Sequence, residues 1–290
     1  MSAQVFLQLV VNGIMLGGVY GIMSLGINLV WGVMGVVNLA HGDFIVAAGF
    51  LTFWLFSRLG LSPLLAFPAG AAMGFALGAV IQKLLLERVP QDRHAGKTSL
   101  LMTFGVSYIL INSAQLLFGN EFQTVMYLPG SWHVLGLDFA KSRALAFSLA
   151  GTVSILLWAF LRFTFAGRAI RAVSQNTDGA SVCGIDIPTI RVVSFGLGSA
   201  LASAAGVLLV LIFTVSPAQG TAYTVRSFAV TVIGGLGSFP GALLGAVILG
   251  ISEVFSGYLL SAQIANGIAF LLFVLVLLAR PQGLLGRKMQ

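Results

Sequence analysis

Two acidic side chains of this 290-residue chain stand inside or beside long apolar stretches. Asp43 follows Asn38-Leu39-Ala40-His41-Gly42 and begins an apolar run, whereas Glu253 lies within a second run. Carboxylates among apolar helices are costly and usually mark a substrate or proton pathway. Asp43 also fits a structural alternative, because the helix macrodipole stabilises a carboxylate in the first turn, with His41 nearby. Glu253 fits no such role, and we expect it to face a bundle interior or a water-filled cavity.

Two glycine-rich segments interrupt these apolar stretches, at Gly32–Gly42 and at Thr221–Gly245, which contains Pro240. Broken helices at membrane depth are tolerated where they are buried or line a cavity, and their free ends can bind charged groups of a substrate. Paired interruptions also predict two related halves with a translocation site between them. The candidate pathway residues are Asn38, His41, Gly42, Asp43, Gly234, Gly235, Gly237 and Glu253.

Enzymatic chemistry has little support in the residue types present. The single cysteine, Cys183, excludes a multi-cysteine metal site, and the three histidines are scattered among different loops. Gly96-Lys97-Thr98 resembles the end of a phosphate-binding loop, but Gln91 stands where that motif needs its first glycine. We therefore expect neither an enzyme nor a cofactor bound by this chain, and no ATP site of its own.

The composition predicts the elements that position these residues. Hydrophobic residues make up 58% of the chain, charged residues 8%, and the mean hydropathy is +1.01. Average soluble proteins are about 25% charged, so we predict an all-α, polytopic membrane bundle forming one domain over 1–290. It would have eight spans, or nine if 222–256 is two segments. The predicted spans are 5–30, 36–57, 61–82, 98–118, 143–161, 189–213, 222–256 and 259–279.

Basic residues predict the orientation of the bundle. Eleven of the fifteen lie in Lys83–Lys97, Arg162–Arg191 and Arg280–Lys288, and the positive-inside rule places such loops in the cytoplasm. The C-terminus is then cytoplasmic, whereas 58–62, 119–142, 214–226 and the N-terminus lie outside, and Asp43 lies near the cytoplasmic end of the bilayer. A nucleic-acid partner would need a continuous basic soluble face, which the sequence lacks.

The basic segment 162–191 has its own helix signals. Asn176 or Thr177 can cap a short second helix, Gly184 can end it, and Pro188 can open the next span. We therefore expect two short helices at the membrane surface. They would form a docking element for a cytoplasmic partner, the alternative being an amphipathic anchor to lipid headgroups.

Four segments together resemble one family: Leu25–Gly49, Gly167–Asp186, Ser227–Gly250 and Arg280–Gly286. It is the branched-chain amino-acid permease family of bacterial ABC importers, and the chain is most similar to its LivH-type subunits. The family commonly has glutamate where this chain has Asp43. The resemblance implies alternating access in the inner membrane, a LivM-type second permease, two cytoplasmic ATPases that hold ATP and Mg²⁺, and a periplasmic solute-binding protein.

The resemblance also implies a coupling role for segment 162–191. The matching positions are Gly167, Arg168, Arg171, Asn176, Ala180, Gly184 and Ile185, and Asp178 lies in the same segment. Related permeases serve urea, short amides or aromatic acids, so those cargoes are the alternative within the same machine. A passive channel or uniporter is the alternative of a different class.

Overall fold

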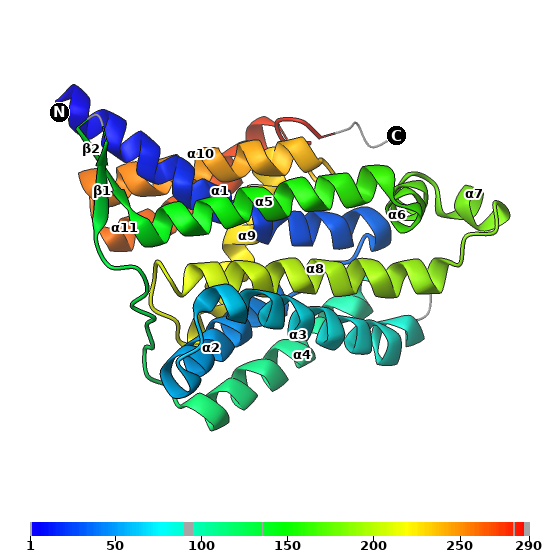
Figure 1. Cartoon of the computed structure of the whole chain (residues 1–290). Coiled ribbons are helices and arrows are strands. Elements are labelled where there is room, and N and C mark those ends of the chain that lie inside the picture. Colours follow the sequence, from blue (N-terminus) through cyan, green and yellow to red (C-terminus); the bar gives the residue numbers. More distant parts are fainter. Residues whose placement is uncertain (1, 90–94, 135, 281, 287–290) are drawn as a thin grey trace.

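The computed structural model describes residues 2–89, 95–134, 136–280 and 282–286, and it is a bundle of long helices that run along one axis (Figure 1). We call the end with the N-terminus and the β1–β2 hairpin the hairpin end, and the opposite end, with α6 and α7, the loop end. The elements are α1 (Ala3–Met34), α2 (His41–Leu59), α3 (Pro63–Leu84), a 3-10 turn (Leu86–Arg88), α4 (Ala95–Phe118), β1 (Ser131–Val134), β2 (Leu137–Ala140), α5 (Lys141–Phe163), α6 (Phe165–Gln175), α7 (Thr177–Val182), α8 (Ile187–Leu209), a 3-10 turn (Pro217–Gln219), α9 (Gly220–Gly234), α10 (Phe239–Leu259) and α11 (Ala262–Ala279).

The described helices confirm a polytopic helical membrane protein. Seven of them are long and apolar enough to cross a bilayer, and leucines on their outer faces, such as Leu116, which is 88% exposed, suit contact with lipid tails. The predicted stretch 222–256 is two helices, α9 and α10. With 15 residues, α9 is about 22 Å long, too short for a hydrocarbon core of about 30 Å. Pro240 lies in the first turn of α10, where its missing N–H costs little.

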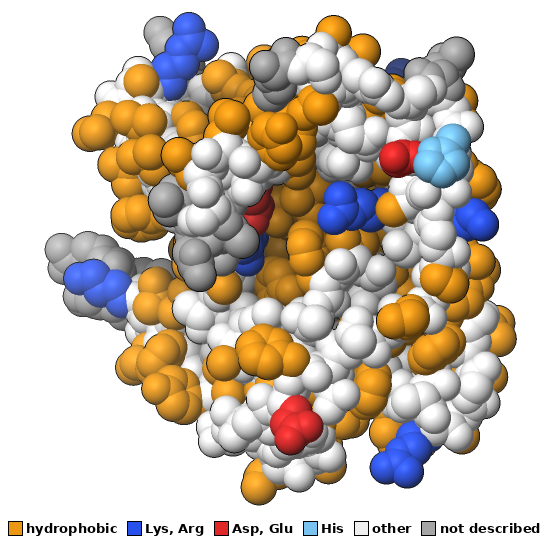
Figure 2. Space-filling view, turned by 90° about the vertical axis from the view of Figure 1, so that its left-hand side faces the viewer, with side chains coloured by type: hydrophobic (Ala, Val, Ile, Leu, Met, Phe, Trp, Pro, Cys, Tyr) orange, Lys and Arg blue, Asp and Glu red, His pale blue; other side chains and the backbone are white. Residues whose placement is uncertain are grey.

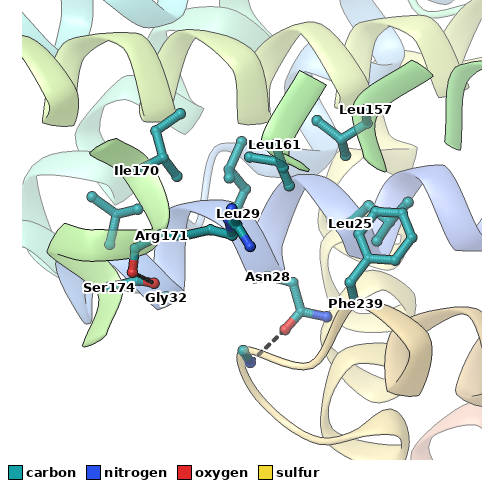
Figure 3. A pocket seen from close by; sticks show the side chains of 12 residues that line it. Leu25, Asn28, Leu29, Gly32, Leu157, Leu161, Ile170, Arg171, Ser174 and Phe239 are labelled. Carbon is teal, nitrogen blue, oxygen red and sulfur yellow. Dashed lines mark hydrogen bonds between the residues drawn. The ribbon is translucent and has the colours of Figure 1, made fainter. Parts of the chain in front are cut away.

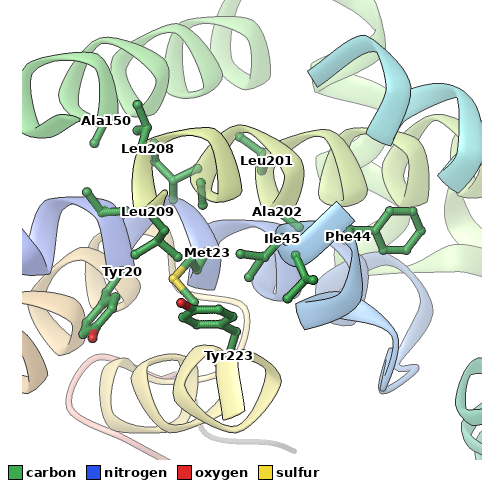
Figure 4. Packing of buried hydrophobic residues seen from close by; sticks show 14 of the residues in the cluster. Tyr20, Met23, Phe44, Ile45, Ala150, Leu201, Ala202, Leu208, Leu209 and Tyr223 are labelled. Atoms are coloured by element: carbon green, nitrogen blue, oxygen red, sulfur yellow. The ribbon is translucent and has the colours of Figure 1, made fainter. Parts of the chain in front are cut away.

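Helices α1 and α8 occupy the centre, and glycines allow close packing against both. Gly13 and Gly17 of α1 face the backbone of α10, and Gly74 and Gly78 of α3 face serines of α8. Close backbone approach of this kind is the role of small residues at membrane helix interfaces. Figure 4 shows the buried core between the helices, where Tyr20 of α1 and residues of α2, α8 and α9 converge.

A further run of glycines at every fourth residue, Gly237, Gly241 and Gly245, is only partly helical. Gly241 and Gly245 lie in α10 and contact the backbone of α9 near Gly234. Gly237 lies in the turn before α10, with φ +77, so it does not extend the helix. The turn separates α9 from α10 and makes the break that the sequence predicted here.

A two-stranded hairpin at 131–140 is the departure from the all-helical prediction. Its antiparallel strands pair Ser131 with Ala140 and Val134 with Leu137. The hairpin lies on the start of α1, where Gln8 exchanges two hydrogen bonds with the backbone of Asp138, of 2.7 and 2.8 Å. Because these strands are short and mostly exposed, they lack the alternating apolar pattern that would have predicted them.

Segment 162–191 contains the two short helices that the sequence predicted. Asn176 caps α7, since its Oδ1 accepts the Gly179 N–H at 2.8 Å, and Thr164 caps α6 by accepting the Gly167 N–H at 3.0 Å. Gly184 follows α7 with φ +79, a conformation that favours glycine after a helix. Pro188 lies in the first turn of α8.

Candidate functional site

Helix α2 begins in the middle of the bundle. Gly35, with φ +62, ends α1, and the chain then returns inward. The His41 Nε2 lies 2.9 Å from the Met23 carbonyl oxygen, well inside α1. Asp43 faces Ser107, which is halfway along α4. The expectation that Asp43 lies near the cytoplasmic end of the bilayer is therefore wrong, because residues 35–40 run back into the bundle before α2 starts.

The starts of α2 and α9 meet at this depth. The Gly42 N–H donates to the Thr224 hydroxyl oxygen at 2.8 Å, and that hydroxyl lies 3.2 Å from the Leu39 carbonyl oxygen. Gly220, the first residue of α9, lies so close to Asp43 that a Cβ on it would collide with the carboxylate. The end of the first glycine-rich segment thus meets the start of α9, and we call this contact the α2–α9 junction.

Polar side chains at the α2–α9 junction are sealed from solvent. Asn38, His41 and Asp43 are each at most 3% exposed. Asp43 lies in the first turn of α2, but the residue that caps α2 is Ala40, which offers no side-chain hydrogen bond. Among the described residues, neither carboxylate oxygen of Asp43 has a hydrogen-bond partner, so Asp43 does not cap α2. These three residues line neither of the two cavities described below.

Gly234, Gly235 and Gly237 lie apart from the junction, at the loop end of α9. The C-terminal tail packs on them: the N–H groups of Leu284 and Leu285 each donate at 2.9 Å, to the carbonyl oxygens of Ile233 and Gly234 respectively. Carbonyls at a helix end need such partners. The tail thus closes α9, and two of the segments singled out in the sequence come into contact.

A small cavity of about 170 Å³ lies beside this turn, between α1, α5, α6 and α10 (Figure 3). In its wall, the Gly237 N–H donates to Asn28 Oδ1 at 2.7 Å. Arg171 and Ser174 of α6 line the same cavity, among apolar side chains that include Leu29. The structure therefore places one candidate pathway residue, Gly237, beside one candidate coupling residue, Arg171.

Glu253 lines a second, larger cavity of about 660 Å³ toward the hairpin end. Figure 2 looks onto this end and shows a hollow with hydrophobic walls and with acidic and basic side chains inside it. The Glu253 Oε1 lies 3.1 Å from Arg226 Nη2, and its Oε2 accepts the Tyr20 hydroxyl at 2.7 Å. Glu253 thus faces a cavity, as expected, and is held by residues of α1 and α9.

Sequence reasoning missed Arg226 and Tyr20 as partners of Glu253. It placed 214–226 in an outer loop, but residues 220–226 belong to α9, and Arg226 is only 16% exposed. The available signal was a lone arginine within an apolar stretch that also ends in a carboxylate. Intramembrane ionisable residues are commonly paired, so Arg226 called for an acidic partner, but the sequence alone does not show which one.

The candidate coupling residues differ in how far they are exposed. Gly167 and Ala180 are buried, and Gly167 leaves no room for a Cβ against the end of α5. Arg168, Arg171 and Asp178 are exposed. Asn176 and Gly184 set the bounds of α7, and Ile185 is half-buried. Val182, at the tip of α7, is 90% exposed.

Neither cavity has the chemistry of a metal centre. Across the described ranges, no group of three or more histidine, cysteine, aspartate or glutamate side chains could hold a metal ion. Gly96 and Lys97, from the phosphate-loop resemblance, lie in the first turn of α4, and Gln91 and His94 fall outside the described residues.

Comparison with known proteins identifies the family. A family model described as the permease component of the branched-chain amino acid transport system matches residues 9–278. The chain belongs to this permease family. The permease is 31% identical to the high-affinity branched-chain amino acid transport system permease protein LivH of Escherichia coli K12, over 97% of this chain and 96% of that protein. It is 30% identical, with the same coverage, to the corresponding permease protein BraD of Pseudomonas aeruginosa.

A solved structure supports the fold of the permease. The structure titled PsaBC from Streptococcus pneumoniae in complex with Fab superposes with a TM-score of 0.52 at 16% identity, over 96% of this chain and 92% of that one. At this identity the likeness concerns the fold alone.

Proposed function

We propose that this permease is the membrane subunit of an ATP-driven importer for branched-chain amino acids in a bacterial inner membrane. Its partners would be a second permease of LivM type, two cytoplasmic ABC ATPases that carry ATP and Mg²⁺, and a periplasmic solute-binding protein. The observation that carries the proposal is the end-to-end similarity to LivH and BraD, whose names state this transport.

The orientation follows from charge and geometry. The basic segment 162–191 lies at the loop end together with Lys83, Arg88 and Lys97, and few of the described basic residues lie at the hairpin end. With the positive-inside rule, the loop end and the C-terminal tail face the cytoplasm, and the larger cavity opens toward the periplasm. Cargo released by the binding protein would enter that cavity.

The α6–α7 segment would couple the ATPases to the bundle. Its exposed Arg168, Arg171 and Asp178, with Val182 at the tip, present a charged and apolar surface that projects from the loop end (Figure 1). Its buried face, with Ile170 and Val173, packs on α1, α5 and α8. A push on α6 would therefore reach the centre of the bundle.

Alternating access would use the two halves of the chain as related units. Helix α1 is followed by a break and by α2, which starts at mid-depth; α8 is followed by a break and by α9, which also starts there. Because α1 and α8 run in opposite directions, the halves would form an inverted repeat, as in several transporter folds. Helix α9, with the larger cavity on one face and the α2–α9 junction on the other, would be the gate.

The test is to purify the tagged permease gently from its native membrane, identify its partners and reconstitute them in liposomes. Recovery with a second permease and ATPases, and ATP-dependent uptake of leucine in the presence of the binding protein, is the expected result. Uptake of urea, acetamide or benzoate instead of leucine would reassign the cargo. If the permease is recovered without any partner protein and passes solute without ATP, a channel would be favoured.

A further inference from the structure

The ion pair in the larger cavity joins three helices. Arg226 of α9 and Glu253 of α10 approach to 3.1 Å, with side chains 16% and 12% exposed. Tyr20 of α1 donates its hydroxyl to the second carboxylate oxygen of Glu253. The Arg226 guanidinium lies 5.8 Å from the ring centroid of Tyr223. All four side chains line the cavity of about 660 Å³.

Stability alone is a weak reason for such a pair. Removing two charges from water costs free energy that their attraction hardly recovers, so well-packed apolar side chains in their place are often as stable. In this structure both side chains are largely buried, yet both line the wall of the larger cavity. Paired charges that face an intramembrane cavity are by default part of a functional site.

The lining of the cavity matches the chemistry of one solute class. An α-amino acid with an aliphatic side chain is neutral overall, yet it carries a carboxylate and an ammonium on one carbon. The cavity likewise combines one positive and one negative group with an apolar wall that includes Phe213 and Val225. A solute with a net charge would leave one group of the pair uncompensated, and a neutral amide would give neither group an ionic partner.

We propose that Arg226 and Glu253 form the subsite that receives the zwitterionic head of the amino acid, an inference that rests on the proposed import function. The Arg226 guanidinium binds the α-carboxylate, and the Glu253 carboxylate binds the α-ammonium. The aliphatic side chain lies toward Phe213 and Val225. Guanidinium groups suit carboxylates because their N–H donors match the two oxygens. Glu253 accepts one hydrogen bond on each oxygen, which leaves acceptor capacity for an ammonium.

The ion pair also keeps the subsite neutral while no amino acid is bound. Without cargo, each charge compensates the other; with cargo, one ion pair becomes two. The subsite therefore need not bind tightly, which suits a pathway from which the solute must leave again. Because Arg226 lies on α9 and Glu253 on α10, occupation by cargo would also alter the link between these two helices.

The test uses the assembled importer without its binding protein and a cysteine reporter in the cavity. Ala222 lines the same cavity and is exposed, so Ala222→Cys in a Cys183→Ser background reports occupation through its rate of thiol labelling. Leucine should slow the labelling, whereas leucinamide, without a carboxylate, and 4-methylpentanoate, without an ammonium, should each need about tenfold higher concentrations.

Two variants assign each charge to its partner. In Arg226→Gln, leucine should lose its advantage over leucinamide only, and in Glu253→Gln its advantage over 4-methylpentanoate only. A purely structural role would change the response to all three ligands equally, which would overturn the proposal. Tyr20→Phe removes a hydrogen bond but keeps the pair, and should keep both preferences.

Labelling of Ala222→Cys with Arg226 and Glu253 intact tests the subsite even if the charge variants fail to fold. Equal protection by leucine and both analogues, or no protection by leucine, would overturn the zwitterion subsite. Failure of the proposed function has a different signature, namely that the complete importer with ATP and its binding protein takes up no leucine.

Discussion

Gly42 lies against Gly220, so that the starts of α2 and α9 touch backbone to backbone. A Cβ on Gly42 would collide with the Gly220 carbonyl oxygen and with Thr224. Because both helices begin inside the bundle, this contact sets the distance between their first turns. If transport moves α9 relative to α2, this backbone contact has to shift or break.

Gly42→Ala should therefore destabilise the permease. The added methyl group has no space beside the backbone of α9, and overpacking of this kind costs about 1–3 kcal/mol. Thermal unfolding of the assembled complex in detergent should show a lower midpoint, and leucine uptake should fall. Gly151→Ala is the matched control, because Gly151 also lies in a membrane helix but has no neighbour within 4 Å of a built Cβ. Equal unfolding midpoints for the two variants would contradict the close contact.

Local sequence signals predicted several elements of the fold, although they did not predict the contact between these two glycines. The interruptions and the caps are local signals, and they predicted the break between α9 and α10 and the helices α6 and α7. Asn176 could be identified as a cap from its neighbours alone. The family resemblance rested on these same segments.

Depth and pairing were not predictable in this way. The depth of Asp43 in the bundle depends on residues 35–40, which run back into it. In a hydropathy pattern these residues show only as a gap between two spans. The Arg226–Glu253 pair joins residues 27 positions apart in sequence, and only the turn after α9 brings them together. The hairpin at 131–140 depends on contacts with α1 that its own residues do not signal.

Charge reversal at the two exposed arginines of α6 should uncouple the importer. Arg168 and Arg171 are both exposed at the loop end, so Arg168→Glu with Arg171→Glu should leave folding and membrane insertion intact. Leucine uptake should fall by about tenfold or more, because each lost charge-assisted contact with an ATPase is worth roughly 1.5–3 kcal/mol. Uptake and ATP hydrolysis measured on the same proteoliposomes give the coupling ratio.

Arg88→Glu is the control for this experiment, since Arg88 is exposed at the same end but lies outside α6 and α7. It changes the charge of the cytoplasmic face without touching the coupling segment. Normal uptake in the double variant, or an equal loss in the control, would count against a specific role for α6.

The orientation can be measured with the single native cysteine. Cys183 is exposed at the end of α7, so a membrane-impermeant maleimide should label it in inside-out vesicles and not in intact spheroplasts. Ala222→Cys in the Cys183→Ser background should show the reverse pattern, because the larger cavity opens toward the hairpin end. Labelling of both positions from the same side would contradict the proposed arrangement of the cavity and the loop end.

Asn28→Ala tests how α1 holds the turn between α9 and α10. The Asn28 Oδ1 accepts the Gly237 N–H at 2.7 Å (Figure 3), and a hydrogen bond of this kind contributes about 0.5–1.5 kcal/mol. Hydrogen exchange of the Gly237 amide should therefore accelerate by about threefold to tenfold, since opening of this turn becomes easier. Asn112→Ala is the control, because within the described part of the chain the Asn112 side chain bonds a carbonyl of its own helix.

The expected functional effect of Asn28→Ala follows from the smaller cavity. Asn28 lies in its wall with Arg171 of α6, so the turn after α9 is adjacent to the proposed coupling helix. A looser turn should transmit less of the motion of α6 to α9, and leucine uptake per ATP hydrolysed should fall although the complex still assembles. Faster exchange at Gly237 with an unchanged coupling ratio would show that the signal passes to α9 by another route, through the packing of α1 on α8.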